Sequence, residues 1–279
     1  MKLVIHAFML FLICNTFSVE SFARKSKGMN IVGEEVSYMA NGITMKGYIA
    51  YDKSQKGKRP GVLVVHEWWG CNEYAKKQAR MLAGLGYIAM AVDLYGNGKI
   101  ATDPTTAQQY ATAYYQNPVL ARELLEAARF TMKNYAQTDE NKIAAIGYCF
   151  GGGVLLNMAR MGMDFKGIVS FHGSLNGTPA AAGTVNTQIL VCHGEADVFV
   201  KPEEVIAFQQ SLKAANIPYE FISYPDATHA FTNPDATATG KQFGMPIEYN
   251  EAADKKSWND MAVFLKKVFA VSVKTVIVE

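Results

Sequence analysis

Short apolar runs alternate with amphipathic segments along most of the chain. The β-branched run 61–66 is typical of a strand that is buried on both faces of a parallel sheet. Segment 73–85 instead carries apolar residues at helical spacing (Tyr74, Met81, Leu82 and Leu85) and stops before a glycine. Strands that alternate with helices of this kind predict βαβ units, and therefore a mainly parallel sheet with helices on both faces.

The same pattern predicts the remaining elements. Asn41-Gly42, between two alternating segments, predicts an N-terminal β-hairpin. Asp103-Pro104 and Asn117-Pro118 each offer an N-cap residue followed by proline, so a helix is expected to begin at each pair. The tail 271–279 is either an extra strand or disordered. Further strands are expected at 87–92, 143–148, 167–171, 188–192 and 219–224, and further helices at 154–161, 202–215 and 251–269.

One stretch, 143–153, joins an apolar run to a glycine-rich helix start. It contains Gly147, then Cys149, then three consecutive glycines. Gly-x-nucleophile-x-Gly spacing suits a sharp strand-to-helix turn, because the apex residue has a positive φ and its flanking positions have no room for side chains. A helix N-terminus also favours a thiolate. We predict that Cys149 is a nucleophile; the alternative is a small buried apolar residue, as most unpaired cysteines are.

Two later strand ends offer partners for this nucleophile. Asp197 follows one predicted strand and His229 follows the last one, so both belong at the same edge of a parallel sheet. The order nucleophile, acid, histidine is that of the α/β-hydrolase fold. We expect His229 to be the general base and Asp197 to orient it, with Glu195 and Asp226 as rival acids. The other histidines outside the N-terminal segment are expected to brace loops: His66, His172 and His193.

The loop after the first buried strand reads His-Glu-Trp-Trp-Gly at 66–70. It begins like a zinc-binding His-Glu-x-x-His motif, but Gly70 replaces the second ligand, so we predict no metal and no other cofactor. The loop is expected to supply one oxyanion donor, the Trp68 N–H, beside the Phe150 N–H. Glu67 then lies in or beside the pocket, where a carboxylate should raise its own pKa and that of the thiol.

The N-terminus adds a targeting prediction. Residues 3–17 are apolar after Met1-Lys2, and Ser21 and Ala23 occupy the −3 and −1 positions of a cleavage site. This pattern predicts a secretory signal peptide that is cut after Ala23, and hence a periplasmic or secreted protein. An uncleaved anchor is the alternative, although the run is shorter than the ~20 residues of a spanning helix. Removal of 23 of the 279 residues leaves 256, the size of one α/β domain at 24–279.

Charge and cysteine content exclude some classes. A formal net charge of +2 indicates neither nucleic acid nor an acidic membrane surface as a partner. Three cysteines follow the predicted cleavage site, which is too sparse and odd a count for a disulfide scaffold. Whether Cys71 and Cys192 pair stays open, as does the oligomeric state.

The chain resembles the dienelactone hydrolase family, small α/β-hydrolases with a cysteine nucleophile. The resemblance spans nearly all of the chain after the N-terminal segment. Besides 64–70 and 145–153, it lies in Ala-Val-Asp-Leu-Tyr-Gly at 91–96, His-Gly-Glu-Ala-Asp at 193–197 and Tyr-Pro-Asp-Ala-Thr-His-Ala-Phe at 224–231. It implies a hydrolase of the carboxymethylenebutenolidase type, which cleaves a lactone or carboxylic ester through a thioacyl-enzyme.

The resemblance also implies roles for individual residues. The triad would be Cys149, Asp197 and His229. Glu67 would contact the resting thiol and accept its proton when substrate displaces the carboxylate. The substrate pocket would include Trp69, Tyr95, Lys99 and Phe231.

Two regions depart from the family pattern. Dienelactone hydrolases hold the substrate carboxylate with arginines, one shortly after the Asp-Leu-Tyr segment and one a few residues past the histidine. Here these regions read Gly-Asn-Gly-Lys at 96–99 and Ala-Phe-Thr-Asn-Pro at 230–234, and no arginine follows Arg160. Lys99 offers only a point charge in place of a bidentate clamp. The chemistry is therefore expected to carry over better than the substrate, a small ester or lactone.

Other functions remain open from the sequence. In one alternative, the chain is a non-catalytic or redox-sensing member that uses Cys149 as a reactive thiol. In another, it is an acyltransferase or peptidase.

Overall fold

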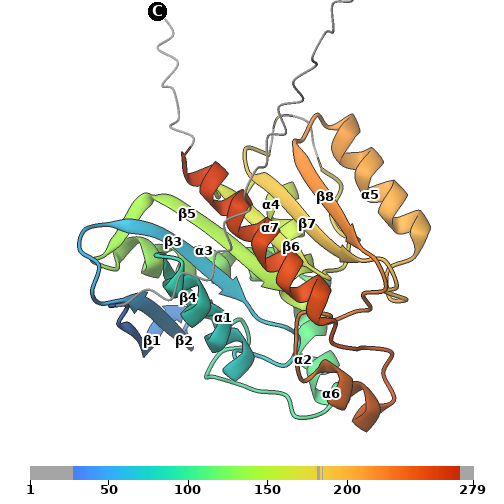
Figure 1. Ribbon diagram of the computed structural model, residues 1–279, viewed down its shortest axis with the longest axis horizontal. Helices are drawn as coiled ribbons and strands as arrows, with labels where there is room; N and C mark the ends of the chain where they lie inside the picture. Colours follow the sequence, from blue (N-terminus) through green and yellow to red (C-terminus); the bar gives the residue numbers. More distant parts are fainter. Residues whose placement is uncertain (1–27, 181–182, 184, 271–279) are drawn as a thin grey trace, which may run out of the picture.

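The computed structural model describes residues 28–180, 183 and 185–270. Eight strands form one sheet in the order β1-β2-β4-β3-β5-β6-β7-β8 (Figure 1). The β1–β2 and β2–β4 pairs are antiparallel, and all the other neighbours are parallel. The predicted mainly parallel sheet with an N-terminal hairpin is confirmed.

The strands follow the predicted apolar runs. Asn41 and Gly42 have φ of 49° and 74°, as a two-residue hairpin turn requires, because both central residues of a type I′ turn need positive φ. The strand bounds are β1 Ile31–Ala40, β2 Ile43–Asp52, β3 Arg59–Val65, β4 Ile88–Val92, β5 Thr138–Tyr148, β6 Gly167–Phe171, β7 Gln188–Gly194 and β8 Tyr219–Tyr224.

Helices cover both faces of the sheet and form two cores. Along β3, Leu63 and Val65 belong to one core cluster, whereas Val62 and Val64 belong to the other, because successive side chains of a strand point to opposite faces. The helices α1 (Glu73–Gly84) and α7 (Glu251–Ala270) pack on the second cluster, in front of the sheet in Figure 1. The first cluster is covered by α2 (Pro104–Gln116), α3 (Pro118–Asn134), α4 (Phe150–Arg160) and α5 (Pro202–Ala214).

The two predicted Asx-Pro helix starts are confirmed. Asp103 caps α2 by accepting a hydrogen bond from the Thr106 N–H (2.9 Å), and Asn117 caps α3 by accepting one from the Leu120 N–H (3.3 Å). The predicted apolar face of α1 is partly wrong. Met81 and Leu85 are 40% and 44% exposed, because the helix buries a stripe of smaller residues instead: Ala75, Ala79 and Ala83, together with Tyr74, Gln78 and Leu82.

One helix, α6 (Ala236–Phe243), was not predicted. Its sequence lacks apolar residues at helical spacing, and Ala236 and Gly240 are its buried residues. It ends at Gly244, whose left-handed conformation is a frequent helix stop. The helix matters because Phe243 stacks on Trp69, with ring centroids 6.2 Å apart.

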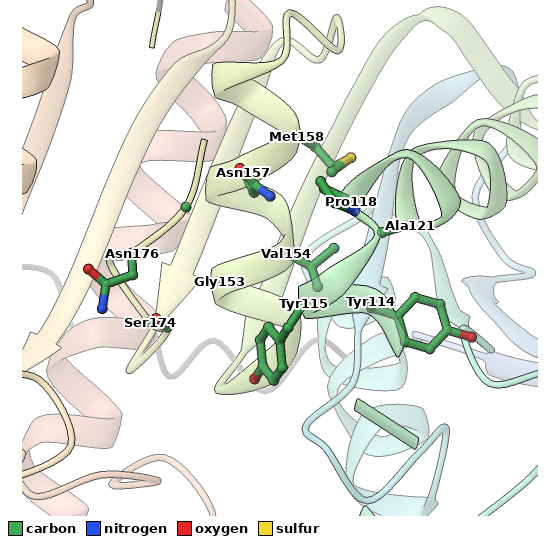
Figure 2. Close-up of a pocket in the computed structure, with 11 residues that line it drawn as sticks. Tyr114, Tyr115, Pro118, Ala121, Gly153, Val154, Asn157, Met158, Ser174 and Asn176 are labelled. Carbon is green, nitrogen blue, oxygen red and sulfur yellow. The ribbon is translucent and has the colours of Figure 1, made fainter. Parts of the chain in front are cut away.

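Some predictions cannot be placed on the fold. The signal peptide and the tail 271–279 lie outside the described residues. Within the described ranges, none of the helices combines the length and the apolar character that a bilayer crossing needs. The described part does contain a hollow of about 220 Å³ between α4 and the junction of α2 with α3 (Figure 2).

The carboxylate of Asp93 ties the end of β4 to the hairpin. Its side chain is fully buried and accepts four backbone N–H hydrogen bonds, all between 2.9 and 3.0 Å. Three of the donors follow it in the same loop, and the fourth, Lys46, belongs to β2. Removing this carboxylate would leave several buried donors without a partner.

We therefore predict that Asp93→Ala lowers the free energy of unfolding by roughly 3–5 kcal/mol, measured by urea denaturation. The comparison variant is Asn117→Ala, which removes one exposed helix cap and should cost about 1 kcal/mol. Similar losses in the two variants would contradict the role given to Asp93.

Candidate active site

The strand-turn-helix at Cys149 has the geometry that its glycines require. Cys149 has φ 50° and ψ −114°, and it joins β5 directly to α4. A Cβ atom on Gly147 would lie 2.4 Å from the Gly151 carbonyl oxygen, and one on Gly151 would lie 2.5 Å from that of Val65. Side chains at both positions are therefore excluded by backbone atoms. The turn brings Cys149 to the carboxyl edge of the sheet.

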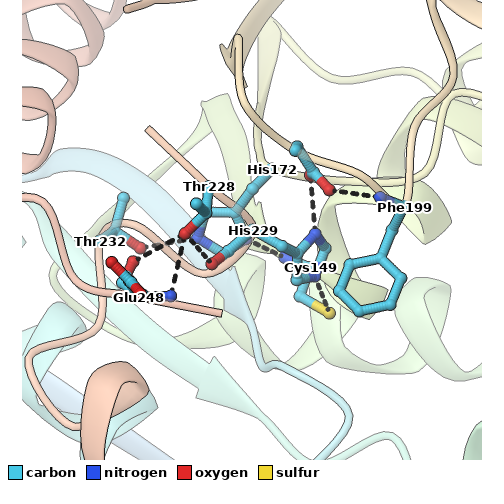
Figure 3. Close-up of polar contacts among 8 residues, drawn as sticks. Cys149, His172, Phe199, Thr228, His229, Thr232 and Glu248 are labelled. Atoms are coloured by element: carbon cyan, nitrogen blue, oxygen red, sulfur yellow. Dashed lines mark hydrogen bonds and ion pairs between the residues drawn. The ribbon is translucent and has the colours of Figure 1, made fainter. Parts of the chain in front are cut away.

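Three side chains from separate loops meet at this edge (Figure 3). The His229 Nε2 atom lies 3.0 Å from the Cys149 Sγ atom, and its Nδ1 atom lies 2.8 Å from Asp197 Oδ2. The other carboxylate oxygen of Asp197 accepts the Phe199 N–H at 2.9 Å. The imidazole is thus held between a thiol and a buried carboxylate, which is the geometry of a nucleophile, a base and its orienter.

His229 favours its protonated form. Burial alone would lower the pKa of His229, but the charge of the Cys149 thiolate and the hydrogen bonds of Asp197 and Cys149 raise it well above its ordinary value. The rival acids Glu195 and Asp226 are both exposed, and neither of them hydrogen-bonds His229. The arrangement can therefore hold a thiolate and imidazolium pair.

A second histidine, His172, contacts the turn at Cys149. His172 is buried, and its Nδ1 atom accepts the Cys149 N–H at 3.1 Å, which leaves Nε2 to donate to Thr232 Oγ1 at 2.7 Å. Thr232 in turn contacts the Tyr74 hydroxyl at 2.8 Å. Burial and the charge of His229 keep the pKa of His172 well below its ordinary value, so the ring is neutral. Its ring packs edge-on against His229, with centroids 5.3 Å apart.

The N–H groups of Trp68 and Phe150 are the two donors expected for an oxyanion. Neither one donates a hydrogen bond to an acceptor in the part of the chain that the structure describes. The Gly151 N–H donates to the His66 carbonyl (3.1 Å), and the Tyr95 hydroxyl donates to the Trp68 carbonyl (2.9 Å). The first bond ties the loop to the start of α4, and the second ties it to the segment that follows β4. The role of the Trp68 and Phe150 N–H groups as oxyanion donors stays a prediction.

The His66 ring holds the same loop from inside. It is buried, and burial lowers its pKa to about 4, so it is neutral. Its Nε2 atom accepts the Leu94 N–H (3.3 Å), and its Nδ1 atom hydrogen-bonds the Glu67 carbonyl. His66 therefore braces the loop, as the sequence predicted. His193 makes a different contact, because its ring packs on Phe221 with centroids 5.6 Å apart.

Glu67 is a buried carboxyl whose side-chain partner is an amide. Asn233 Nδ2 donates to Glu67 Oε2 at 2.8 Å, and burial raises the pKa of Glu67 to about 7. The contact between Glu67 and the resting thiol that the family resemblance implied is not present among the described residues. Instead, the Cys149 Sγ atom contacts His229 Nε2, and the Glu67 carboxyl accepts a hydrogen bond from Asn233 Nδ2. Asn233 lies in one of the two regions where the family carries an arginine.

The four residues expected to contact substrate lie in different surroundings. Trp69 is half-buried between Trp68 and Phe243, and Lys99 is exposed with its Nζ atom 5.6 Å from the Tyr110 ring centroid. The other two side chains lie deeper in the fold, and their substrate roles stay predictions. Tyr95 is buried, and its hydroxyl donates to the Trp68 carbonyl. Phe231 is 0% exposed and packs against His172 and Tyr224.

Two further cysteines lie among the described residues. Cys71 and Cys192 are both buried and free, so they do not pair in this structure. Burial raises the pKa of each to about 12. In the part of the chain that the structure describes, no three His, Cys, Asp or Glu side chains come together as ligands for a metal ion.

Several residues near the site were missed or undervalued from the sequence. His172 was expected only to brace a loop, yet it contacts both the turn and His229. Thr232 and Asn233 stand three and four residues past His229, a proximity that could have drawn attention to them. Phe199, whose ring packs edge-on against His229 at 5.2 Å, gave no signal beyond its place near Asp197.

Comparison with known proteins places this geometry among related chains. The model of the dienelactone hydrolase family matches residues 45–269. A dienelactone hydrolase-like promiscuous phosphotriesterase from metagenomic libraries is 31% identical, with a TM-score of 0.79 over 86% of this chain and 99% of that one. The structure named m3DLH is 34% identical, with a TM-score of 0.81 over the same shares. A protein of Escherichia coli strain K12, provisionally named a carboxymethylenebutenolidase, is 30% identical over 250 residues, 85% of this chain and 88% of that one.

The buried carboxyl of Glu67 makes a prediction about stability and pH. Because its pKa rises from 4.5 to about 7 on burial, the folded state keeps a proton that the unfolded state releases between these pH values. This contribution to stability is fully present below pH 4.5 and is lost as pH rises through 7. Relative to Glu67→Gln, the wild type should therefore lose about 2–3 kcal/mol between pH 5 and pH 8.

Urea denaturation of both proteins at several pH values measures this difference. Glu195→Gln is the matched control, since it removes an exposed carboxylate near the same site. If the gap between wild type and Glu67→Gln stays constant from pH 5 to pH 8, Glu67 does not hold the proton.

Proposed function

Because the chain belongs to the dienelactone hydrolase family, we propose that it hydrolyses a carboxylic ester or lactone at Cys149. The observation that carries the proposal is the line of contacts from Asp197 through His229 to the Cys149 Sγ atom, at 2.8 and 3.0 Å. A thiol alone would suit many functions. A thiol with a base, a buried orienter and two free N–H groups suits acyl transfer.

In the first step, the thiolate of Cys149 attacks the carbonyl carbon. A carbon–sulfur bond forms, and the carbonyl electron pair moves to the oxygen, which the N–H groups of Trp68 and Phe150 stabilise. The carbon–oxygen bond to the leaving group then breaks, and His229 gives its proton to the departing oxygen. The product of this step is a thioester on Cys149.

In the second step, water replaces the sulfur. Neutral His229 takes a proton from the attacking water, and Asp197 stabilises the imidazolium that results. The tetrahedral intermediate collapses, the carbon–sulfur bond breaks, and Cys149 leaves as the thiolate. The pair with His229 is thereby restored.

We assign Glu67 a part in the proton balance of this site. A permanent carboxylate so close to His229 would disfavour both the thiolate and the oxyanion through like-charge repulsion. With its pKa near 7 and its hydrogen bond from Asn233, Glu67 can instead hold a proton when negative charge builds up nearby. It then serves as a proton reservoir beside the reacting atoms.

The proposal for the cellular location rests on the N-terminal pattern alone. We propose that the chain is exported and cut after Ala23. The mature N-terminus should then be Arg24, as measured by intact mass and N-terminal sequencing of the protein expressed in full length. Recovery of the chain with its first 23 residues attached would support an anchor instead.

We predict that Cys149→Ala and His229→Ala each lower kcat/KM for p-nitrophenyl acetate by about a thousandfold or more, because each removes a member of a unit that acts together. Cys149→Ser should lose nearly as much, since the surroundings suit a thiolate. Acid quenching of the wild type during turnover should leave an acetyl group on the peptide that contains Cys149, as detected by mass spectrometry.

The matched control is Cys71→Ala, which removes a buried thiol outside the site and should keep its activity. One result would defeat the hydrolase proposal: no turnover of any ester by the wild type while iodoacetamide labels Cys149 quickly. The redox-sensing alternative would then account better for the thiol.

A further inference from the structure

A hollow of about 220 Å³ opens beside the first turns of α4 and is not used by the mechanism above. Figure 2 shows Tyr115 near Gly153 and Val154, with Ser174 and Asn176 across from it. An apolar cavity of about 150 Å³ is enough to hold benzene in another protein. This hollow therefore has room for a fragment somewhat larger than a benzene ring.

The lining of the hollow carries no formal charge. Aromatic rings and aliphatic side chains make up much of it: Tyr114, Tyr115, Pro118, Ala121, Val154 and Met158. Of its amides, Asn157 accepts the Thr178 N–H (2.8 Å) and Asn176 donates to Glu204 (3.0 Å). Arg160 lies further along α4, but it is buried and donates to the Leu175 carbonyl. A carboxylate in this hollow would lose its water without gaining a cation.

The hollow is next to the nucleophile. The Gly153 N–H, on its wall, donates to the Cys149 carbonyl at 3.1 Å. The Tyr115 ring packs edge-on against Phe150, whose N–H is one of the two oxyanion donors, with centroids 5.6 Å apart. Cys149 also packs against the core cluster that contains Val154 and Met158.

We propose that this hollow binds the uncharged, apolar part of the ester, an alkyl or aryl group of about benzene size. The proposal rests on the hydrolase function and narrows its substrate class. Neutral esters with an apolar group on the acyl or the alcohol side are the substrates that fit. A substrate that ends in a carboxylate is not, because Arg160, the cation beside Gly177 on this wall, is buried and already donates to the Leu175 carbonyl.

Two ester series test the proposal. One lengthens the acyl chain of p-nitrophenyl esters from acetate to hexanoate, and the other lengthens the alcohol of alkyl acetates from ethyl to hexyl. We expect kcat/KM to rise by up to about fourfold for each methylene buried in one of the series. In the favoured series, an ester of equal length that ends in a carboxylate should be at least tenfold poorer.

Two variants alter the hollow from different sides. Ser174→Trp fills it, and Tyr115→Ala removes a wall residue that is 52% exposed and so is not needed for folding. Both should lower the ratio of kcat/KM for the longest ester to that for the shortest. Phe130→Ala, at an exposed aromatic residue of α3 outside the hollow, should leave this ratio as in the wild type.

A protection experiment, which measures binding without turnover, distinguishes this proposal from the hydrolase function. Hexanamide, but not acetamide, should protect Cys149 of the wild type from iodoacetamide, and Ser174→Trp should lose the protection. Turnover of short esters with a flat chain-length profile in both series overturns the hollow as a subsite but leaves the hydrolase function standing. If the protein turns over no ester but hexanamide still protects Cys149, the hydrolase function is overturned and the apolar site stands. Absence of protection overturns the site.

Discussion

The close approach of three backbone segments at Cys149 determines the rest of the site. Gly147 and Gly151 let β5, the end of β3 and the start of α4 come within distances that no Cβ atom allows. This contact fixes Cys149 at positive φ and lets the Gly151 N–H reach the His66 carbonyl. The loop that carries Glu67 and Trp68 is therefore placed by the same contact that presents the thiol. One steric constraint thus positions both the nucleophile and its neighbours.

The ionisable side chains around the Cys149 thiol are mostly neutral, apart from His229 and Asp197, which lie in one line with it. Burial keeps His66 and His172 neutral, and it raises the pKa of Glu67 to about 7, so that this carboxyl holds its proton below neutral pH. In the proposed mechanism, charge is then confined to Cys149, His229 and Asp197. In a buried site, charges interact over longer distances than in water, so neutral neighbours leave the ion pair unperturbed. Burial is the main cause of the shifted pKa values of the three flanking groups, His66, Glu67 and His172.

Local signals in the sequence predicted much of the fold. The turn at Asn41-Gly42, the caps at Asp103 and Asn117 and the strand before Cys149 all depend on neighbouring residues, so their patterns are readable. Contacts between residues that are distant in the sequence could not be predicted in this way. Glu67 and Asn233 are 166 residues apart, and nothing local pairs them. Side-chain direction was also out of reach: Phe231 lies two residues from His229, yet it points into the core. The helix α6 was missed because it buries almost no apolar side chain.

The three described cysteines differ in a way that bears on the chemistry of the whole chain. Cys71 and Cys192 are buried, and burial raises the pKa of both thiols to about 12, so they stay protonated and shielded. Cys149 is the partly exposed one and sits beside an imidazolium. A thiol-specific electrophile that meets the described part of the folded molecule therefore finds one accessible thiol. Among the described residues, a spectroscopic or cross-linking probe attached through thiol chemistry would mark a single known position, with Cys71 and Cys192 left in place.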